Sequence, residues 1–129
     1  MKTIYQRVYD KLEELVGNLR EIPEAKKSQV PGFMDLNLDR LSPNGDVTAI
    51  ALSHYYKHPS GDMIPDPDME IRIMPKARTA EALSYQDSFG YRLVYGEEGR
   101  TVSVAVKQDL NQFLEQWLSN CLEQGHRLN

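Results

Sequence analysis

The spacing of apolar residues changes twice along this chain, and this change constrains the fold more than any other feature. From residue 3 to about residue 20, apolar side chains recur at three- and four-residue steps, as on one side of an α-helix. In the middle of the chain they alternate with polar side chains, as in half-buried strands. From Asp109 to Gly125 the helical spacing returns. The order helix, strands, helix predicts an α+β domain.

Five segments are predicted as strands because apolar and polar residues alternate in them: 34–38, 47–56, 69–74, 91–95 and 101–106. Turn-forming residues predict hairpins at 42–46 and from Gly96 to Gly99. The polar segment 21–32 is predicted to be a linker, and the residues of 79–86 fit either a helix or a strand. We expect an antiparallel sheet of about five strands with the N-terminal and C-terminal helices packed on one face, in two layers.

The C-terminal helix has the clearest pattern. Asp109 is the predicted N-cap, Gln112 completes a capping box, and Gly125 is the predicted C-terminal cap. Between the caps lies an unbroken apolar stripe: Leu110, Phe113, Leu114, Trp117, Leu118, Cys121 and Leu122. Cys121 is the only cysteine in the chain, so an internal disulfide is excluded. Its place on the stripe indicates a small buried hydrophobe, and a catalytic thiol is the alternative.

Length and charge limit the classes of function. With 129 residues the chain suffices for a single domain, 1–129. A net charge of −4 provides no positive field for nucleic acid or an anionic membrane, so we expect neither as a partner. No apolar run approaches the length of a membrane span, and the N-terminus lacks the apolar core of a signal peptide. We therefore expect a cytoplasmic protein of bacterial type.

The stretch 53–72 concentrates histidines, tyrosines, carboxylates and turn residues. The run from Pro59 to Pro67 is predicted to be a surface connection between two strands, and such connections often carry binding residues. The candidate binding surface comprises His54, Tyr55, Tyr56, His58, Asp62, Asp66, Asp68, Glu70, Arg72 and Tyr85. Because no complete catalytic set accompanies it, the first hypothesis is a non-enzymatic binding or regulatory module with a protein partner and no cofactor.

The two histidines of this stretch have the four-residue spacing of zinc ligands on a helix. On a strand, four residues span about 13 Å, too far to share one metal ion. We therefore interpret His54 and His58 as solvated turn histidines. A metal site would require His58 to fold back onto an aspartate of the same stretch.

The carboxylates suggest an alternative function, a metal-dependent hydrolase of the nuclease type. Such enzymes hold divalent cations between carboxylates that follow one another on a hairpin and the next strand. The metal ligands would be Asp62, Asp66, Asp68 and Glu70, with Arg72 contacting phosphate. Many such sites carry lysine where this chain has Arg72, and the two side chains are not interchangeable. Aspartates beside Pro65 and Pro67 also form good turns, which is the interpretation we favour.

Aromatic residues are expected on the uncovered face of the sheet. The set is Tyr55, Tyr56, Tyr85, Phe89, Tyr91 and Tyr95. Lysine and arginine are not interleaved with them, so protein contact is favoured over the stacking of nucleobases. A sheet covered on one side leaves apolar side chains exposed, and closed pairing of two copies is the commonest solution, so we also expect a homodimer.

Two parts of the chain resemble known groups of proteins. The sequence Asn111-Gln112-Phe113-Leu114, then Trp117-Leu118 and Cys121-Leu122 before Gly125, resembles the C-terminal helix of the YqiB-like proteins, an uncharacterised bacterial family. Residues 69–73 and 80–82 are similar to the central strands of that family, which favours a strand for 79–86. The members of that family lack the full His-Tyr-Tyr and Asp-Pro-Asp pattern.

Those two motifs, His54-Tyr55-Tyr56 and Asp66-Pro67-Asp68, together with 61–62 and 84–87, resemble a domain of unknown function encoded on bacterial plasmids and integrative elements. This second resemblance implies a link to mobile elements. Neither group has an assigned activity, so the two resemblances bear on the fold and leave the function open.

Overall fold

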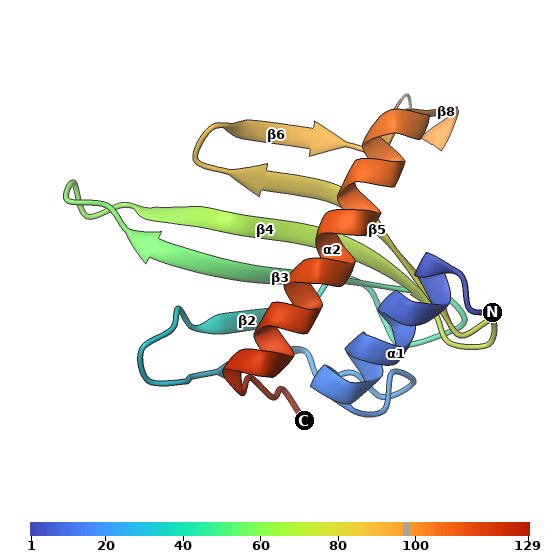
Figure 1. Ribbon diagram of the computed structural model, residues 1–129, viewed down its shortest axis with the longest axis horizontal. Coiled ribbons are helices and arrows are strands. Elements are labelled where there is room, and N and C mark those ends of the chain that lie inside the picture. The colour runs from blue at the N-terminus through green and yellow to red at the C-terminus, as the bar shows by residue number, and fades with distance from the viewer. Residues whose placement is uncertain (97–98) are drawn as a thin grey trace.

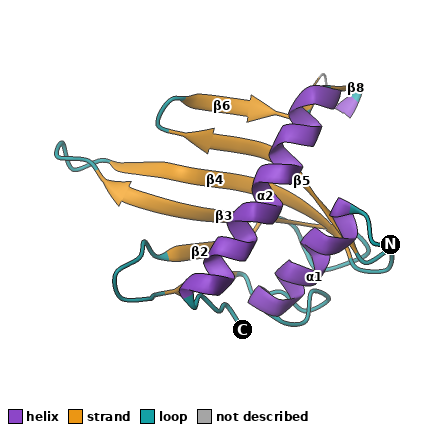
Figure 2. Cartoon of the chain, viewed as in Figure 1, coloured by secondary structure: helices purple, strands orange, loops and turns teal. Residues whose placement is uncertain are grey.

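In residues 1–96 and 99–129, which the computed structural model describes, two helices pack on one face of an antiparallel sheet (Figure 1, Figure 2). The elements are α1 (Ile4–Val16), β1 (Ala25–Ser28), β2 (Leu36–Arg40), β3 (Thr48–Lys57), β4 (Met63–Met74), β5 (Thr79–Asp87), β6 (Gly90–Leu93), β7 (Tyr95–Gly96), β8 (Thr101–Val102) and α2 (Val104–Gln124). The main sheet of the described residues has six strands in the order of the sequence, and β7 pairs with β8 separately. The predicted α+β class and two layers are confirmed, with six strands in the main sheet instead of about five.

Helix α1 ends earlier than predicted. At its start, Thr3 Oγ1 accepts a hydrogen bond from the Gln6 backbone N–H at 3.2 Å, and Gln6 Oε1 accepts one from the Thr3 N–H at 2.8 Å. This capping box supplies acceptors for two backbone N–H groups at the helix start. Gly17, with φ of 95°, ends the helix. Leu19 and Ile22 follow outside the helix and still reach the core, which is why the apolar pattern continues to residue 20.

The predicted linker 21–32 contains an edge strand, β1, which pairs with β2. The first three residues of β1 are exposed, and Ser28 alone is buried. Since the pairing uses backbone groups, these side chains show no alternation of apolar and polar residues from which the strand could be predicted.

The β3–β4 hairpin is longer than predicted, and its free end extends beyond α2 (Figure 1). The predicted connection from Pro59 to Pro67 is therefore wrong in extent, because the turn covers only residues 58–62. From Ser53 to Tyr55 the strand β3 takes two steps, whereas β4 takes three from Asp68 to Pro65. β4 contains Pro65 and Pro67, and a proline has no backbone N–H to donate to the hydrogen bonds between strands. The irregular register accommodates these prolines within β4.

Residues 79–86 belong to strand β5, the assignment that the family resemblance favoured. Its register with β4 shifts between Glu70 and Ile71, and Leu83 is the additional residue. Next to the shift, the Ala82 N–H donates to Oδ1 of Asn111 in α2 at 2.8 Å. Asn111 is buried, so α2 supplies a hydrogen-bond partner to the sheet from within the core.

Helix α2 begins at Val104 and not at Asp109, because Ser103 is its N-cap and accepts a hydrogen bond from the Val106 N–H at 3.4 Å. The predicted strand 101–106 is accordingly reduced to β8, although Gly125 is the C-terminal cap as predicted. Gly96 pairs with Thr101 as a hairpin requires, while positions 97 and 98 of the predicted turn lie outside the described residues.

The hydrophobic core lies between the sheet and the two helices. Its fully buried side chains include Leu12, Leu15, Leu36, Leu38, Ile50, Leu52, Met69, Ile71, Ile73 and Leu110. Those from β2, β3 and β4 occupy alternate strand positions, so one face of the sheet is apolar and the other polar, as predicted. No helix of the described residues has the length and apolar character to cross a membrane.

Candidate binding site

The residues predicted to form one contact surface lie in separate places. On the sheet face opposite the helices, here called the open face, are Tyr55, Asp68 and Glu70. Around a pocket on the helix side are His54, Asp66 and Tyr85. Toward the end of the β3–β4 hairpin are Tyr56, His58 and Asp62. Strand alternation separates His54 from Tyr55, since successive side chains point to opposite faces, and the register shift between β3 and β4 separates Asp66 from Asp68.

The hairpin turn is closed by its own side chains. Nδ1 of His58 accepts a hydrogen bond from the Ser60 N–H at 3.1 Å, and the Ser60 hydroxyl donates to Asp62 Oδ2 at 3.3 Å. His58 is exposed, as predicted for a solvated turn histidine. These contacts are sufficient to explain the residue types in the turn.

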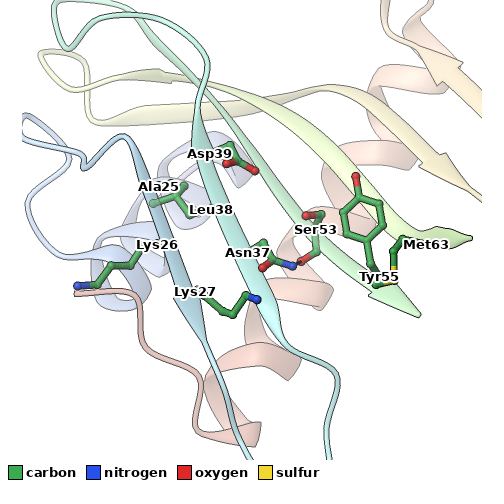
Figure 3. A pocket seen from close by; sticks show the side chains of 9 residues that line it. All are labelled: Ala25, Lys26, Lys27, Asn37, Leu38, Asp39, Ser53, Tyr55 and Met63. Carbon is green, nitrogen blue, oxygen red and sulfur yellow. Dashed lines mark hydrogen bonds between the residues drawn. The ribbon is translucent and has the colours of Figure 1, made fainter. Parts of the chain in front are cut away.

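The open face is hollowed between β1 and β4 (Figure 3). The lining residues are Ala25, Lys26, Lys27, Asn37, Leu38, Asp39, Ser53, Tyr55 and Met63, and the hollow holds about 610 Å³. Figure 3 shows Tyr55 and Met63 at one end and Lys26 pointing away at the other. The Tyr55 hydroxyl donates to Asp68 Oδ2 at 2.7 Å, and this bond, with burial, raises the pKa of Tyr55 to about 12. Tyr55 therefore stays protonated near neutral pH.

Carboxylates occupy the centre of the open face. Asp39, Asp68 and Glu70 line a second hollow of about 410 Å³ together with Ser84, whose hydroxyl donates to Glu70 Oε2 at 3.1 Å. Asp62 and Asp66 lie elsewhere, so the four carboxylates of the hydrolase hypothesis are not brought together. Within residues 1–96 and 99–129, no group of three or more histidine, cysteine, aspartate or glutamate side chains has a geometry that could hold a metal ion.

Arg72 forms an intramolecular ion pair with Glu81. Its Nε donates to Glu81 Oε1 at 3.0 Å, and its guanidinium lies 5.1 Å from the ring centroid of Tyr95. Glu81 also accepts from the Tyr95 hydroxyl at 2.9 Å and pairs with Lys107 at 3.4 Å. Although burial opposes it, this set of partners lowers the pKa of Glu81. Arg72 is thus engaged by Glu81, a role different from the predicted contact with phosphate.

The helix side carries a hollow lined by several aromatic side chains, here called the aromatic pocket. It holds about 490 Å³ and is lined by Gly32, Phe33, Met34, His54, Asp66, Pro67, Tyr85, Phe113, Trp117, Asn120 and Gln124. These residues come from the β1–β2 loop, the strands β3, β4 and β5, and α2. In Figure 1, α2 crosses the sheet and leaves one end of β3, β4 and β5 uncovered. The lining of the pocket combines residues of these strands with residues of α2.

Three aromatic rings meet at the α2 side of the pocket. The ring centroids of Tyr85 and Phe113 are 5.2 Å apart with an interplanar angle of 83°, and those of Phe113 and Trp117 are 6.3 Å apart at 32°. Phe113 is 39% exposed, and Phe33 of the facing loop is 49% exposed. Exposed aromatic side chains around a concave site are typical of binding surfaces.

His54 forms the floor of the aromatic pocket and is only 6% exposed. The interpretation of His54 as a solvated turn residue is wrong, because β3 continues to Lys57 and places this side chain against α2. Its Nδ1 lies 2.8 Å from the Asp35 backbone oxygen. A carbonyl oxygen only accepts, so Nδ1 carries the proton and the bond fixes the β1–β2 loop to the sheet. The ring also packs edge-to-face on Trp117 at 5.4 Å.

Cys121 lies beside His54, with 3.8 Å between Sγ and Nε2. The thiol is 1% exposed, and burial raises its pKa to about 12. A protonated, buried thiol is a poor nucleophile, so the structure supports the structural role predicted for Cys121 over the catalytic one. The S–H donates to Nε2, the acceptor nitrogen of His54.

Several pocket residues could not be selected from the sequence. Phe33 and Met34 lie in the β1–β2 loop, although the strand predicted for 34–38 began at Met34, and Phe113, which lines the same pocket, was predicted to belong to the buried stripe of α2. The spacing of Phe113 and Trp117, one helical turn apart, was the available signal for a shared face.

A family model described as a domain of unknown function (DUF6908) matches residues 4–127. The match covers almost the whole chain and assigns no activity to it. No curated protein and no solved structure matches the chain. The resemblances to the YqiB-like proteins and to the plasmid-encoded domain stay expectations, because the matched family supports only their common element, a domain of unknown function.

Proposed function

Since the chain belongs to the DUF6908 family, whose function is unknown, we propose from its own geometry that it is a non-enzymatic module that binds a protein partner through the aromatic pocket. The bacterial cytoplasm is the setting expected for this role. The observation that carries the proposal is the convergence of Phe33, Tyr85 and Phe113, from a loop, a strand and a helix, on one solvent-accessible hollow. Aromatic side chains are enriched at protein interfaces, and tyrosine is frequent among the residues that dominate their affinity.

The rest of the molecule supports this choice over the hydrolase alternative. The carboxylates required for metal binding are divided between two faces and a turn, and Arg72 is paired with Glu81. The aromatic residues of the pocket, by contrast, line one hollow together.

A pull-down tests the proposal. Proteins are captured from a lysate of the native cells, and the proteins bound by three baits are compared. Three baits are needed: the wild type, the pocket variant Phe33→Ala/Phe113→Ala and the open-face variant Tyr91→Ala/Leu93→Ala. All four side chains are exposed, so we expect each bait to fold, which circular dichroism would check. The proposal predicts a protein that the wild type and the open-face variant capture and the pocket variant loses. Equal capture by the pocket variant would show that the pocket is not the contact surface.

A further inference from the structure

We propose that the aromatic pocket selects a positively charged side chain, a lysine or an arginine of the partner protein. This inference rests on the proposed function and specifies the chemistry of the partner. It is carried by the arrangement of the aromatic rings, by the charges around them and by a contrast with the other aromatic side chains of the chain.

The rings of Tyr85, Phe113 and Trp117 line the hollow in different orientations. Tyr85 meets Phe113 edge-to-face, whereas Phe113 and Trp117 are tilted by 32°. The face of an aromatic ring carries negative electrostatic potential, so several rings around one site attract a cation and exclude water from it. Such a site gains more from an ammonium or guanidinium group than an apolar pocket of the same size would.

The charges near the rings have the sign that a cation requires. Asp66 lines the pocket, and the Tyr85 hydroxyl donates to Asp87 Oδ2 at 2.8 Å. Burial, and after it the carboxylates of Asp87 and Asp66, raise the pKa of the Tyr85 hydroxyl to about 12, against the opposing charge of Arg92. Among the described residues that line the pocket there is no lysine or arginine. Arg92 pairs with Tyr85 in the sheet register, but its guanidinium binds Asp109 of α2 at 3.2 Å.

Other tyrosines of the chain already hold cations of the chain itself. Arg78 lies over the ring of Tyr9 at 5.0 Å, and Lys107 lies over the ring of Tyr5 at 5.4 Å. In the described part of the chain, no such cation lies over the three rings of the pocket. The pocket thus combines aromatic rings with carboxylates, and the cation would come from the partner protein.

A side chain of a protein fits the pocket better than a free organic cation. The hollow opens to solvent beside Phe33 and Met34, which are 49% and 41% exposed and belong to the loop rim. A peptide that inserts a basic side chain would cover these two residues with its backbone and neighbouring side chains, and a small cation would leave them in water.

Titration with short peptides tests the inference. Trp117 is the only tryptophan and lines the pocket, so its fluorescence reports occupancy. The probes are acetyl-Gly-X-Gly-amides with X as lysine, arginine, norleucine or glutamate, together with tetramethylammonium. We expect the lysine and arginine peptides to bind about 3- to 30-fold more tightly than the norleucine peptide, the range that a cation–π contribution implies. The glutamate peptide should bind more weakly than norleucine.

Matched variants locate the effect. Asp66→Asn should weaken the lysine peptide several-fold and leave the norleucine peptide unchanged, whereas Asp62→Asn, the same charge change in the hairpin turn, should alter neither. Equal affinities for lysine and norleucine would overturn the selection of a cation while leaving the lysate comparison free to support the proposed function. Tetramethylammonium that binds as tightly as the lysine peptide would overturn the assignment to a protein side chain, and so would a Trp117 signal that no probe changes.

Discussion

His54 links the stability of the fold to the shape of the proposed site. Its Nδ1 holds the Asp35 carbonyl, and its ring supports Trp117, so the same side chain anchors the loop rim and forms the floor of the aromatic pocket. The variant His54→Phe retains a ring and removes the donor. We expect the free energy of unfolding to fall by about 1–3 kcal/mol, the cost of a buried acceptor that loses its partner, as measured by urea denaturation.

The same substitution at His58 is the control. His58 lies in the exposed turn, so His58→Phe should change the free energy of unfolding by less than about 0.5 kcal/mol. Similar losses from the two variants would contradict the role assigned to His54.

His126 makes the stability of the fold depend on pH. It is fully buried, its Nδ1 lies 2.8 Å from the Ser28 hydroxyl oxygen, and its ring centroid is 5.9 Å from that of His54. Burial, with a smaller contribution from His54, lowers the pKa of His126 below its usual 6.5. Because the unfolded chain then binds a proton that the folded chain does not, the stabilisation is complete above about pH 6.5 and is lost as pH falls.

Between about pH 7 and pH 5.5, we therefore expect the free energy of unfolding to decrease by at most about 1.4 kcal/mol per pH unit from this group. Urea denaturation at several pH values measures the slope. In His126→Asn, which has no titrating ring at this position, the slope over the same interval should be smaller, and an unchanged slope would assign the effect to other groups.

At the scale of single residues, the sequence predicted which side chains are buried more successfully than which side chains meet around one pocket. The helical stripe predicted Trp117 and Cys121 as core residues, and both are buried. That Asp66 joins His54 and Tyr85 around one pocket could not be predicted, because the register of β4 shifts between Asp68 and Pro65 and alternation no longer fixes the face of Asp66. The apolar pattern does not contain that shift.

At the scale of elements, α2 is held in position by a hydrogen bond as well as by packing. Asn111 accepts from the Ala82 N–H at 2.8 Å and donates to the Lys107 backbone oxygen at 2.8 Å. In Asn111→Leu, a side chain of similar size leaves the Ala82 N–H without an acceptor in the core, so we expect a loss of about 1–3 kcal/mol in the free energy of unfolding.

Thermal and urea denaturation would measure this loss against Asn120→Leu, which makes the same change at an exposed position of the same helix and should cost less than about 0.5 kcal/mol. If Asn111→Leu is as stable as the wild type, the contact between β5 and α2 depends on apolar packing alone.

The elements themselves were predictable where apolar side chains alternate on one buried face, as in β2 and β3. Prediction failed where backbone groups or caps decide the structure. Strand β1 is an exposed edge, and the start of α2 is set by Ser103, which places three alternating valines in or beside the first helical turn. The alternation of Val102, Val104 and Val106 therefore predicted a strand where the helix begins.

At the scale of the whole molecule, the open face is the expected contact between two copies of the chain. Tyr91 and Leu93 of β6 are 55% and 47% exposed there, as the sequence predicted for a sheet covered on one side. We expect light scattering at micromolar concentration to give twice the 14.8 kDa mass of one chain. Leu93→Glu should shift the mass toward one copy, because it replaces an exposed apolar side chain of this face with a charge that pairing would bury.

Val104→Glu is the matched control, since it introduces the same charge at an exposed valine in the helix layer and should leave the mass unchanged. A wild-type mass near 14.8 kDa would contradict the dimer without affecting the aromatic pocket, which lies on the other side of the sheet.

Photo-cross-linking inside cells tests whether the partner contacts the aromatic pocket. The photoreactive residue p-benzoylphenylalanine replaces Phe113 in one variant and Tyr91 in another, so that an exposed aromatic residue on each face is exchanged for a related aromatic side chain. After irradiation, we expect a covalent adduct with a second protein species from position 113, while position 91 yields at most the cross-linked dimer. An adduct with another protein from position 91, and none from position 113, would contradict this contact.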